Sequence, residues 1–232
     1  MAVPTPNVQE RAVQIPAGRA RLDGDLAIPD NPAGIVLFAH GSGSSRFSPR
    51  NRHVAGILQA AGLATLLMDL LTPQEEQVDA PSGHLRFDIG LLADRLLLAT
   101  DWVRSQHEMQ NVAIGYFGAS TGGGAALVAA AERPELVRAV VSRGGRPDLA
   151  GAALARVQAP TLLIVGGQDL PVIEMNQAAL RQLQSQARLE IVPGATHLFE
   201  EPGTLDQVAD LARDWFLRYL KADKRPERRA AA

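Results

Sequence analysis

The sequence of 232 residues contains no cysteine. This absence excludes disulfide bonds, thiolate metal sites and a cysteine nucleophile. Charge of one sign is not in excess either, since 23 basic and 25 acidic residues leave a formal net charge of -2 at pH 7. A chain with this balance has no electrostatic basis for binding nucleic acid or acidic substrates as a class.

Long apolar runs are also missing. No segment approaches the roughly 20 residues that a membrane-spanning helix requires, and the N-terminus has no basic stretch followed by an apolar one. No two histidines have the spacing of metal ligands beside carboxylates. We therefore expect a soluble, cytoplasmic protein that uses neither a metal nor another cofactor and acts on a small molecule; the oligomeric state is left open.

The length and composition favour one globular domain. Apolar residues make up 46% of the chain and charged residues 21%, which is close to average globular usage. A chain of this size can bury a substantial core. We expect a single α/β domain over residues 1–220, followed by a charged, flexible tail at 221–232.

The most informative stretch runs from Asn111 to Ala131 and changes its character around one serine. Before the serine, residues 112–117 form a short β-branched and aromatic run, which predicts a buried strand. After it, residues 125–131 are rich in alanine, which predicts a helix. Gly118 and Gly122 flank Ser120 in the pattern G-x-S-x-G, the spacing of a strand-to-helix elbow that exposes a nucleophile. An ordinary Gly/Ser turn is the alternative.

The rest of the chain alternates between strands and helices. Turn residues, apolar runs and helical periodicity predict strands at 13–15, 20–28, 34–39, 63–68, 112–117, 137–142, 161–165 and 188–192, and helices at 51–61, 88–107, 125–131, 149–157, 172–186 and 205–220. The first two strands predict an antiparallel opening. Residues 69–87 are polar and interrupted by proline, so we expect a long surface connection that lines the site.

This alternation predicts a mostly parallel sheet with helices on both faces. Ligands bind such sheets outside the carboxyl ends of the strands. The candidate polar groups all fall at those ends: His40-Gly41-Ser42, Ser120, Arg143, Asp169 and His197. The order Ser120, Asp169, His197 along the chain is the order of the α/β-hydrolase arrangement.

On these motifs the chain resembles an α/β-hydrolase and, within that superfamily, the dienelactone-hydrolase-like group of small serine esterases. The resemblance covers about residues 13–220. It implies Ser120 as nucleophile, Asp169 as acid and His197 as base. Between Ser142 and Thr161 the chain has room only for a turn and one short helix, so we expect no large cap domain. Dienelactone hydrolases proper use a cysteine nucleophile, which this chain lacks, so activity on dienelactone does not carry over. The substrate class it implies is esters in general.

The chemistry of ester cleavage points to the same residues. A serine hydroxyl needs a neutral imidazole to accept its proton, and the imidazole needs a carboxylate that fixes its tautomer. The developing oxyanion needs two preorganised donors, for which the backbone N–H groups of Thr121 and Ser42 are the candidates. We expect an open site that suits small to medium-sized esters or lactones.

Several alternatives stay open. Arg143 is predicted to bind a carboxylate of the substrate, or else to pair with Asp69 or Asp148 and hold the Gly144-Gly145 turn. Asp69 also ends a predicted strand but precedes the nucleophile, which favours a loop-fixing carboxylate over the catalytic acid. His40 is expected to fasten its own loop. As a whole, the chain could instead be an acyltransferase or perhydrolase with the same three residues, or an inactive fold that serves as a binding module.

Overall fold

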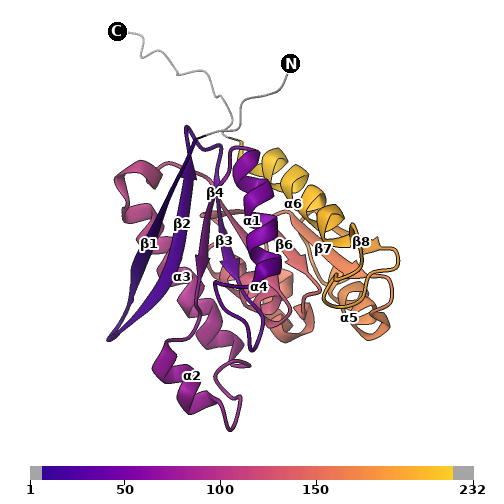
Figure 1. Ribbon diagram of the computed structural model, residues 1–232. Helices are drawn as coiled ribbons and strands as arrows, with labels where there is room; N and C mark the ends of the chain where they lie inside the picture. Colours follow the sequence, from indigo (N-terminus) through magenta and orange to yellow (C-terminus); the bar gives the residue numbers. More distant parts are fainter. Residues whose placement is uncertain (1–6, 222–232) are drawn as a thin grey trace, which may run out of the picture.

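The computed structural model describes residues 7–221 and is built on one eight-stranded sheet (Figure 1). The strands lie in the order β1-β2-β4-β3-β5-β6-β7-β8. β2 pairs antiparallel with β1 and β4, and all the pairs from β4 to β8 are parallel. The strands are β1 (Val8–Ala17), β2 (Ala20–Pro29), β3 (Ile35–Ala39), β4 (Ala64–Met68), β5 (Ile114–Ala119), β6 (Val137–Arg143), β7 (Thr161–Gly166) and β8 (Ala187–Val192). The predicted α/β class and mostly parallel sheet are confirmed.

The N-terminal hairpin is longer than the sequence predicted. β1 begins at Val8, five residues before the predicted start at Val13, and pairs with β2 along its whole length. Its first half is mostly exposed and polar, so it carries no apolar alternation from which a strand could be recognised. Pairing with the neighbouring strand determines this part of β1.

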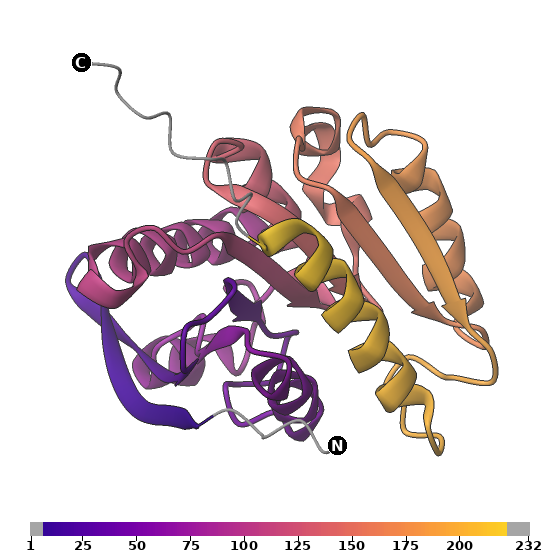
Figure 2. The same cartoon turned by 90° about the horizontal axis from the view of Figure 1, so that it is seen from above.

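Helices cover both faces of the sheet. On one face lie α1 (Pro49–Ala60) and α6 (Thr204–Leu220), which pack Val54, Leu58 and Phe216 into one apolar cluster; Figure 2 shows α6 lying along the sheet. On the other face a second cluster contains buried residues of α3 (Ile89–Ser105), α4 (Thr121–Glu132), the 3₁₀ helix η2 (Pro147–Arg156) and α5 (Leu170–Leu180). A short 3₁₀ helix, η1 (His107–Met109), follows α3. The central strands are therefore buried on both sides, as their continuous apolar runs predicted.

The prediction of an irregular connection over 69–87 was wrong in part, because this segment contains the helix α2 (Pro73–Asp79). Thr72 and Glu75 form a capping box, and Pro73 occupies the first turn, where its missing N–H costs nothing. The sequence T-P-Q-E carries this start signal, but Pro73 was interpreted as an interruption. α2 projects from the edge of the domain in Figure 1.

A buried carboxylate ends α2. Asp79 is fully buried and accepts hydrogen bonds from the Leu85 N–H at 2.6 Å and from Arg86 Nε at 2.5 Å. Burial alone would raise the pKa of Asp79, but the bonds from Arg86 and from the backbone of Leu85 and Arg86 outweigh it and lower the pKa below its ordinary value. The return of the chain from α2 to α3 thus depends on one ionised side chain.

Two other boundaries differ from the predictions and bear on the site. β5 extends to Ala119, so the strand leads directly into Ser120. α5 begins at Leu170, immediately after Asp169, and ends at Leu180, six residues before the predicted end.

Between β6 and β7 the chain forms only a turn and η2, so the described residues contain no large cap domain, as expected. No helix within residues 7–221 has the length and apolar character needed to cross a bilayer.

The crossing of β5–α4 over the end of β3 depends on backbone atoms in contact. A Cβ atom on Gly122 would lie 2.1 Å from the Ala39 carbonyl oxygen, and one on Gly118 would lie 2.4 Å from the Gly122 carbonyl oxygen. Both obstacles are main-chain atoms, which cannot rotate away as a side chain could. Only glycine fits at these two positions without displacing a strand.

We therefore expect Gly122→Ala to lower the free energy of unfolding by about 3 kcal/mol or more, because overpacking against a rigid backbone forces the strand to move. The matched control is Gly56→Ala in α1, where a Cβ atom meets nothing within 4 Å. There the higher helix propensity of alanine should stabilise the protein by up to about 1 kcal/mol. Urea denaturation of both variants measures the difference, and equal stabilities would contradict the proposed backbone contact.

Candidate active site

Ser120 occupies the elbow between β5 and α4, as the G-x-S-x-G spacing predicted. Its backbone has φ 51° and ψ -121°, a conformation with positive φ that is strained for any residue with a side chain. The residue caps α4 through its backbone, and its side chain makes no capping hydrogen bond. Such strain persists only where the surroundings fix the backbone, and here they do so from both sides.

The turn that follows β6 fixes the peptide groups of Ser120. The Ser120 N–H donates to the Arg143 carbonyl at 3.3 Å, and the Ser120 carbonyl accepts from the Arg146 N–H at 3.0 Å and the Gly123 N–H at 2.9 Å. The turn is itself tied to β7 by the Gly144 N–H, which donates to the Ile164 carbonyl at 2.7 Å. Residues 143–146, which bind both peptide groups of Ser120, are called the clasp turn below.

Asn176 of α5 fixes the clasp turn through a hydrogen bond to its backbone. This side chain is completely buried, and its Nδ2 donates to the Gly145 carbonyl at 3.0 Å and to the Val172 carbonyl at 2.8 Å. The sequence analysis did not single out Asn176. The helix α5 also carries Glu174 and Gln177, so the sequence did not distinguish Asn176 from its polar neighbours, and only the fold shows which carbonyl it meets.

Asp169 and His197 lie side by side at the ends of β7 and β8. The Nδ1 atom of His197 lies 2.6 Å from Asp169 Oδ2. Asp169 is the N-cap residue of α5, and its side chain is 14% exposed, whereas that of His197 is 41% exposed. A carboxylate at Nδ1 places the ring proton there and leaves Nε2 as the acceptor.

Ser120 and His197 line one cavity of about 220 Å³. Its walls come from the loop after β3, the first turn of α1, the elbow, the end of β6 and the loop after β8; they are Gly41, Ser42, Ser44, Ser48, Arg50, Asn51, Ala119, Ser120, Arg143, His197 and Leu198. Among the hydrogen bonds of residues 7–221, none joins the side chains of Ser120 and His197. In serine enzymes without ligand this contact is often long and shortens when substrate binds.

The two predicted oxyanion donors differ in their surroundings. Thr121 is the first residue of α4, so its N–H has no acceptor within the helix. The Ser42 N–H, in contrast, donates to Thr121 Oγ1 at 2.9 Å. The structure therefore brings both groups to the elbow but shows Ser42 engaged by a protein acceptor, a contact that the sequence did not predict.

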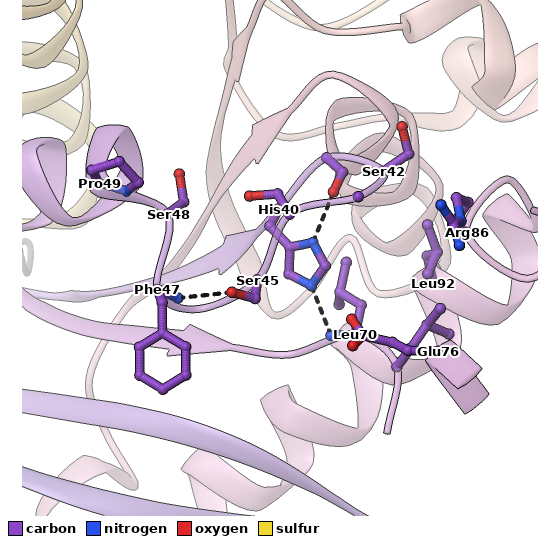
Figure 3. Close-up of a pocket in the computed structure, with 14 residues that line it drawn as sticks. His40, Ser42, Ser45, Phe47, Ser48, Pro49, Leu70, Glu76, Arg86 and Leu92 are labelled. Atoms are coloured by element: carbon purple, nitrogen blue, oxygen red, sulfur yellow. Dashed lines mark hydrogen bonds between the residues drawn. The ribbon is translucent and has the colours of Figure 1, made fainter. Parts of the chain in front are cut away.

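His40 fastens the loop after β3, as expected. Its Nδ1 lies 2.9 Å from the Gly41 carbonyl oxygen, and its Nε2 accepts a hydrogen bond from the Leu70 N–H at 3.0 Å (Figure 3). These two contacts require the neutral ring with its proton on Nδ1. Burial, the largest influence, lowers the pKa of His40 and favours the same neutral form.

A second pocket of about 550 Å³ adjoins the loop that follows β3 and contains His40. Figure 3 shows the residues that line it. It shares Gly41, Ser42, Ser44 and Ser48 with the smaller cavity. Its other walls are mostly apolar, with two charged residues; they are His40, Gly43, Ser45, Phe47, Pro49, Leu70, Leu71, Glu76, Arg86 and Leu92. The segment 69–87, expected to line the site, contributes four of these residues.

Asp69 is bound to an arginine and not to His197. Its carboxylate accepts the Arg46 N–H at 2.7 Å and forms an ion pair with the Arg46 guanidinium. It therefore fixes the loop that leads into α1, which agrees with the loop-fixing interpretation. The structure places Asp169, and not Asp69, beside the candidate base.

Arg143 lies in the cavity that Ser120 and His197 line, but the alternative of a pairing with Asp69 or Asp148 was wrong. Asp148 binds Arg146 in a two-pronged contact at 2.7 and 2.8 Å. Arg143 is only 7% exposed, and its Nε has no partner within the described residues. Burial and the neighbouring Arg50 lower the pKa of Arg143 to about 10, so its guanidinium is still charged at neutral pH.

Arg50 is a second cavity residue that the sequence analysis missed. It lies in the first turn of α1, which the structure starts at Pro49, two residues before the predicted start. Ser48 followed by proline is a helix-start signal that could have placed Arg50 there. Within residues 7–221, no three His, Asp or Glu side chains gather as metal ligands do.

The sheet order, the elbow and the Asp–His contact define an α/β-hydrolase fold with a site at the carboxyl ends of its strands. The model of the dienelactone hydrolase family matches residues 22–222, so the chain belongs to that family. The crystal structure of a dienelactone hydrolase from Anabaena variabilis is 67% identical in sequence and superposes with a TM-score of 0.90, covering 92% of this chain and 99% of that one. The predicted resemblance is thus confirmed.

Other relatives differ in name or in length. Est1E from Butyrivibrio proteoclasticus, solved with ferulic acid, has a TM-score of 0.76 at 18% identity over 91% of this chain and 100% of that one, which shows the common fold. Two Mycobacterium tuberculosis proteins, from strains CDC 1551 / Oshkosh and ATCC 25618 / H37Rv, are 58% identical over 219 residues. Each is named "Putative phosphoribosyl transferase". The match covers 94% of this chain, which spans about half the length of these two relatives.

The contact of Asn176 with the clasp turn predicts an effect on the nucleophile. In Asn176→Leu the Gly145 carbonyl loses its donor, so the turn and Ser120 should shift. We expect the free energy of unfolding to fall by about 1–3 kcal/mol and the rate of Ser120 phosphonylation by a fluorophosphonate to fall about tenfold or more, since small misplacements of a reacting group are costly. Both are measured well below the melting temperature; a lower melting temperature with an unchanged labelling rate would show a purely structural role.

Proposed function

We propose that this protein is a serine hydrolase that cleaves carboxylic esters or lactones of small to medium size through an acyl-serine intermediate on Ser120. One observation carries the proposal. A serine held in a strained elbow conformation lines the same cavity as a histidine whose Nδ1 contacts a carboxylate. Membership of the dienelactone hydrolase family supports hydrolase chemistry but leaves the substrate open.

In the proposed mechanism Ser120 Oγ attacks the carbonyl carbon of the ester while His197 Nε2 accepts the hydroxyl proton. The carbonyl π electrons move onto oxygen, and the tetrahedral intermediate then expels the alcohol, which takes the proton from His197. Water attacks the acyl-serine in the same way and releases the carboxylic acid. Asp169 keeps the ring in the required tautomer and stabilises the imidazolium.

The Thr121 N–H is the first donor proposed for the oxyanion. Its position at the start of α4 adds the favourable field of a helix N-terminus. The Ser42 N–H is the second, and its bond to Thr121 Oγ1 keeps the Ser42 peptide beside the elbow. To serve the oxyanion it must share or exchange that acceptor when substrate binds.

Arg143 is proposed to bind an anionic group of the substrate. It is buried, charged at neutral pH and lines the cavity of Ser120. A guanidinium presents parallel donors that match a carboxylate, so half-esters of dicarboxylic acids are the simplest candidates.

Acyl transfer to an alcohol or peroxide uses the same acyl-serine, and product analysis with competing nucleophiles separates it from hydrolysis. The transferase name of the two longer relatives is not carried to this chain.

Ser120→Ala should abolish the activity without harming the fold. Removing the attacking oxygen should lower kcat/KM on a p-nitrophenyl ester by on the order of a thousandfold or more, while the melting temperature stays unchanged. Intact-mass measurement after incubation with a fluorophosphonate should show one adduct on the wild type and none on Ser120→Ala. Ser105→Ala, at the exposed end of α3, serves as the control and should behave as wild type. An adduct on Ser120→Ala would place the nucleophile elsewhere.

The roles of the two aspartates can be separated by the same substitution at each position. Asp169→Asn should lower kcat by on the order of 10⁴-fold, because the amide favours the wrong tautomer of His197. Asp69→Asn should act mainly on stability, since Asp69 binds Arg46. An active Asp169→Asn beside an inactive Asp69→Asn would transfer the acid role to Asp69.

A further inference from the structure

The cavity lined by Ser120 and His197 also contains two arginines, and no carboxylate of the described residues lines it. Arg143 and Arg50, called the arginine pair below, both line the cavity, and the charge of Arg50 acts directly on Arg143. The Nε atoms of both are buried and have no partner within the described residues. Arg143 takes part in no ion pair of the described residues, and its guanidinium lies 5.8 Å from the centre of the Phe199 ring. Two cations at one site repel each other, and an anion bound between them relieves this repulsion.

The carboxylates near the site already bind other side chains. Asp148 binds Arg146, Asp69 binds Arg46 and Asp169 contacts His197. Glu200 accepts a hydrogen bond from Arg50 Nη1 at 3.2 Å, but its side chain is 64% exposed and lies outside the cavity wall. Among the residues that the structure describes, the arginine pair thus has one solvent-exposed carboxylate as its ion-pair partner, and no carboxylate lines the cavity.

The remaining walls on this side supply further donors. Ser48 is the N-cap of α1, a helix of 12 residues, and Arg50 and Asn51 of its first turn also line the cavity. The N-terminus of a helix favours negative charge, and here it lines the same cavity as Arg143, whose buried Nε has no partner within the described residues. The hydroxyl groups of Ser42, Ser44 and Ser48 complete this wall. Ser48 Oγ accepts from the Asn51 N–H at 3.3 Å, so its own proton is available to donate.

We propose that the arginine pair binds a phosphate group carried by the ester substrate. One guanidinium is sufficient for the two oxygens of a carboxylate, whereas this cavity offers two guanidiniums, several hydroxyls and a helix N-terminus. That donor set matches the three terminal oxygens and the double negative charge of a phosphate monoester. The inference rests on the proposed function of Ser120 and adds a substrate class to it.

The phosphate serves only for recognition and takes no part in the reaction. Ser120 breaks the bond between the carbonyl carbon and the alkoxy oxygen of a carboxylic ester in the same molecule, and the phosphate leaves unchanged on one of the two products. In this proposal the cavity of about 220 Å³ binds the phosphate group and the scissile ester. The adjoining pocket of about 550 Å³ is open to the rest of the substrate.

A matched series of substrates tests the class of anion. The p-nitrophenyl esters of 3-phosphonopropionic acid, succinic acid and butyric acid share one acyl chain and differ only in the terminal group, which is a phosphonate, a carboxylate or a methyl group. We expect KM to be about tenfold or more lower for the phosphonate ester than for the butyrate ester, on the scale of charged hydrogen bonds. Each rate is corrected for its blank without enzyme.

Variants identify the groups responsible. Arg143→Gln and Arg50→Gln should each lower the ratio of kcat/KM for the phosphonate ester over that for the butyrate ester by about tenfold or more. Arg52→Gln is the matched control, because Arg52 lies on α1, is bound to Asp25 and does not line the cavity. Its ratio should equal that of the wild type.

A binding measurement separates this inference from the proposed activity. In the Ser120→Ala protein, inorganic phosphate should raise the melting temperature relative to chloride and acetate at equal ionic strength, and Arg143→Gln should remove this shift. A succinate ester bound as well as the phosphonate ester would overturn the phosphate assignment, and so would a thermal shift that Arg143→Gln leaves unchanged. If the fluorophosphonate fails to label the wild type while phosphate still binds through Arg143, the proposed hydrolase function fails and the phosphate site stands.

Discussion

The close contact between the backbone of β5–α4 and the end of β3 is the constraint on which the site depends. Glycine at 118 and 122 lets main-chain atoms touch where any side chain would overlap a carbonyl. That contact brings the loop after β3 against the first turn of α4, so the N–H groups of Ser42 and Thr121 lie at the same elbow. The strained backbone of Ser120 is retained because the clasp turn bonds its peptide groups on both sides.

The polar residues around the site divide into those that hold the scaffold and those that remain available to a ligand. His40, Asp69 and Asn176 use their hydrogen-bonding groups on neighbouring loops, and each thereby fixes a segment that carries a candidate catalytic residue or borders the cavity. Arg143 and Arg50 retain buried Nε donors that have no partner among residues 7–221. Buried donors without acceptors are uncommon in folded proteins, and both of these belong to arginines that line the cavity of Ser120.

The comparisons with known proteins bear on the family of this chain and on its class of chemistry. The close structural match to a dienelactone hydrolase and the family model support hydrolase chemistry. The two longer relatives from Mycobacterium tuberculosis match this chain over about half of their length, so their name describes more than the segment shared here. The walls of the cavity lined by Ser120 include two arginines, and their charge bears on the substrate proposed above.

The sequence alone determined the parts of the protein that depend on neighbouring residues. Continuous apolar runs identified the parallel strands, G-x-S-x-G identified the elbow, and the positions of Asp169 and His197 after their strands predicted that they would meet at one edge of the sheet. These are local signals, and a parallel sheet converts positions at strand ends into proximity. The tertiary structure decided what depends on partners distant in the chain. The full length of β1 required pairing with β2, the engagement of the Ser42 N–H required Thr121, and the capture of Asp69 by Arg46 and of Asp148 by Arg146 left Arg143 without an acid. A sequence shows which groups carry charge, but burial and competition among partners determine which of them stay free, and both arise only when the chain is folded.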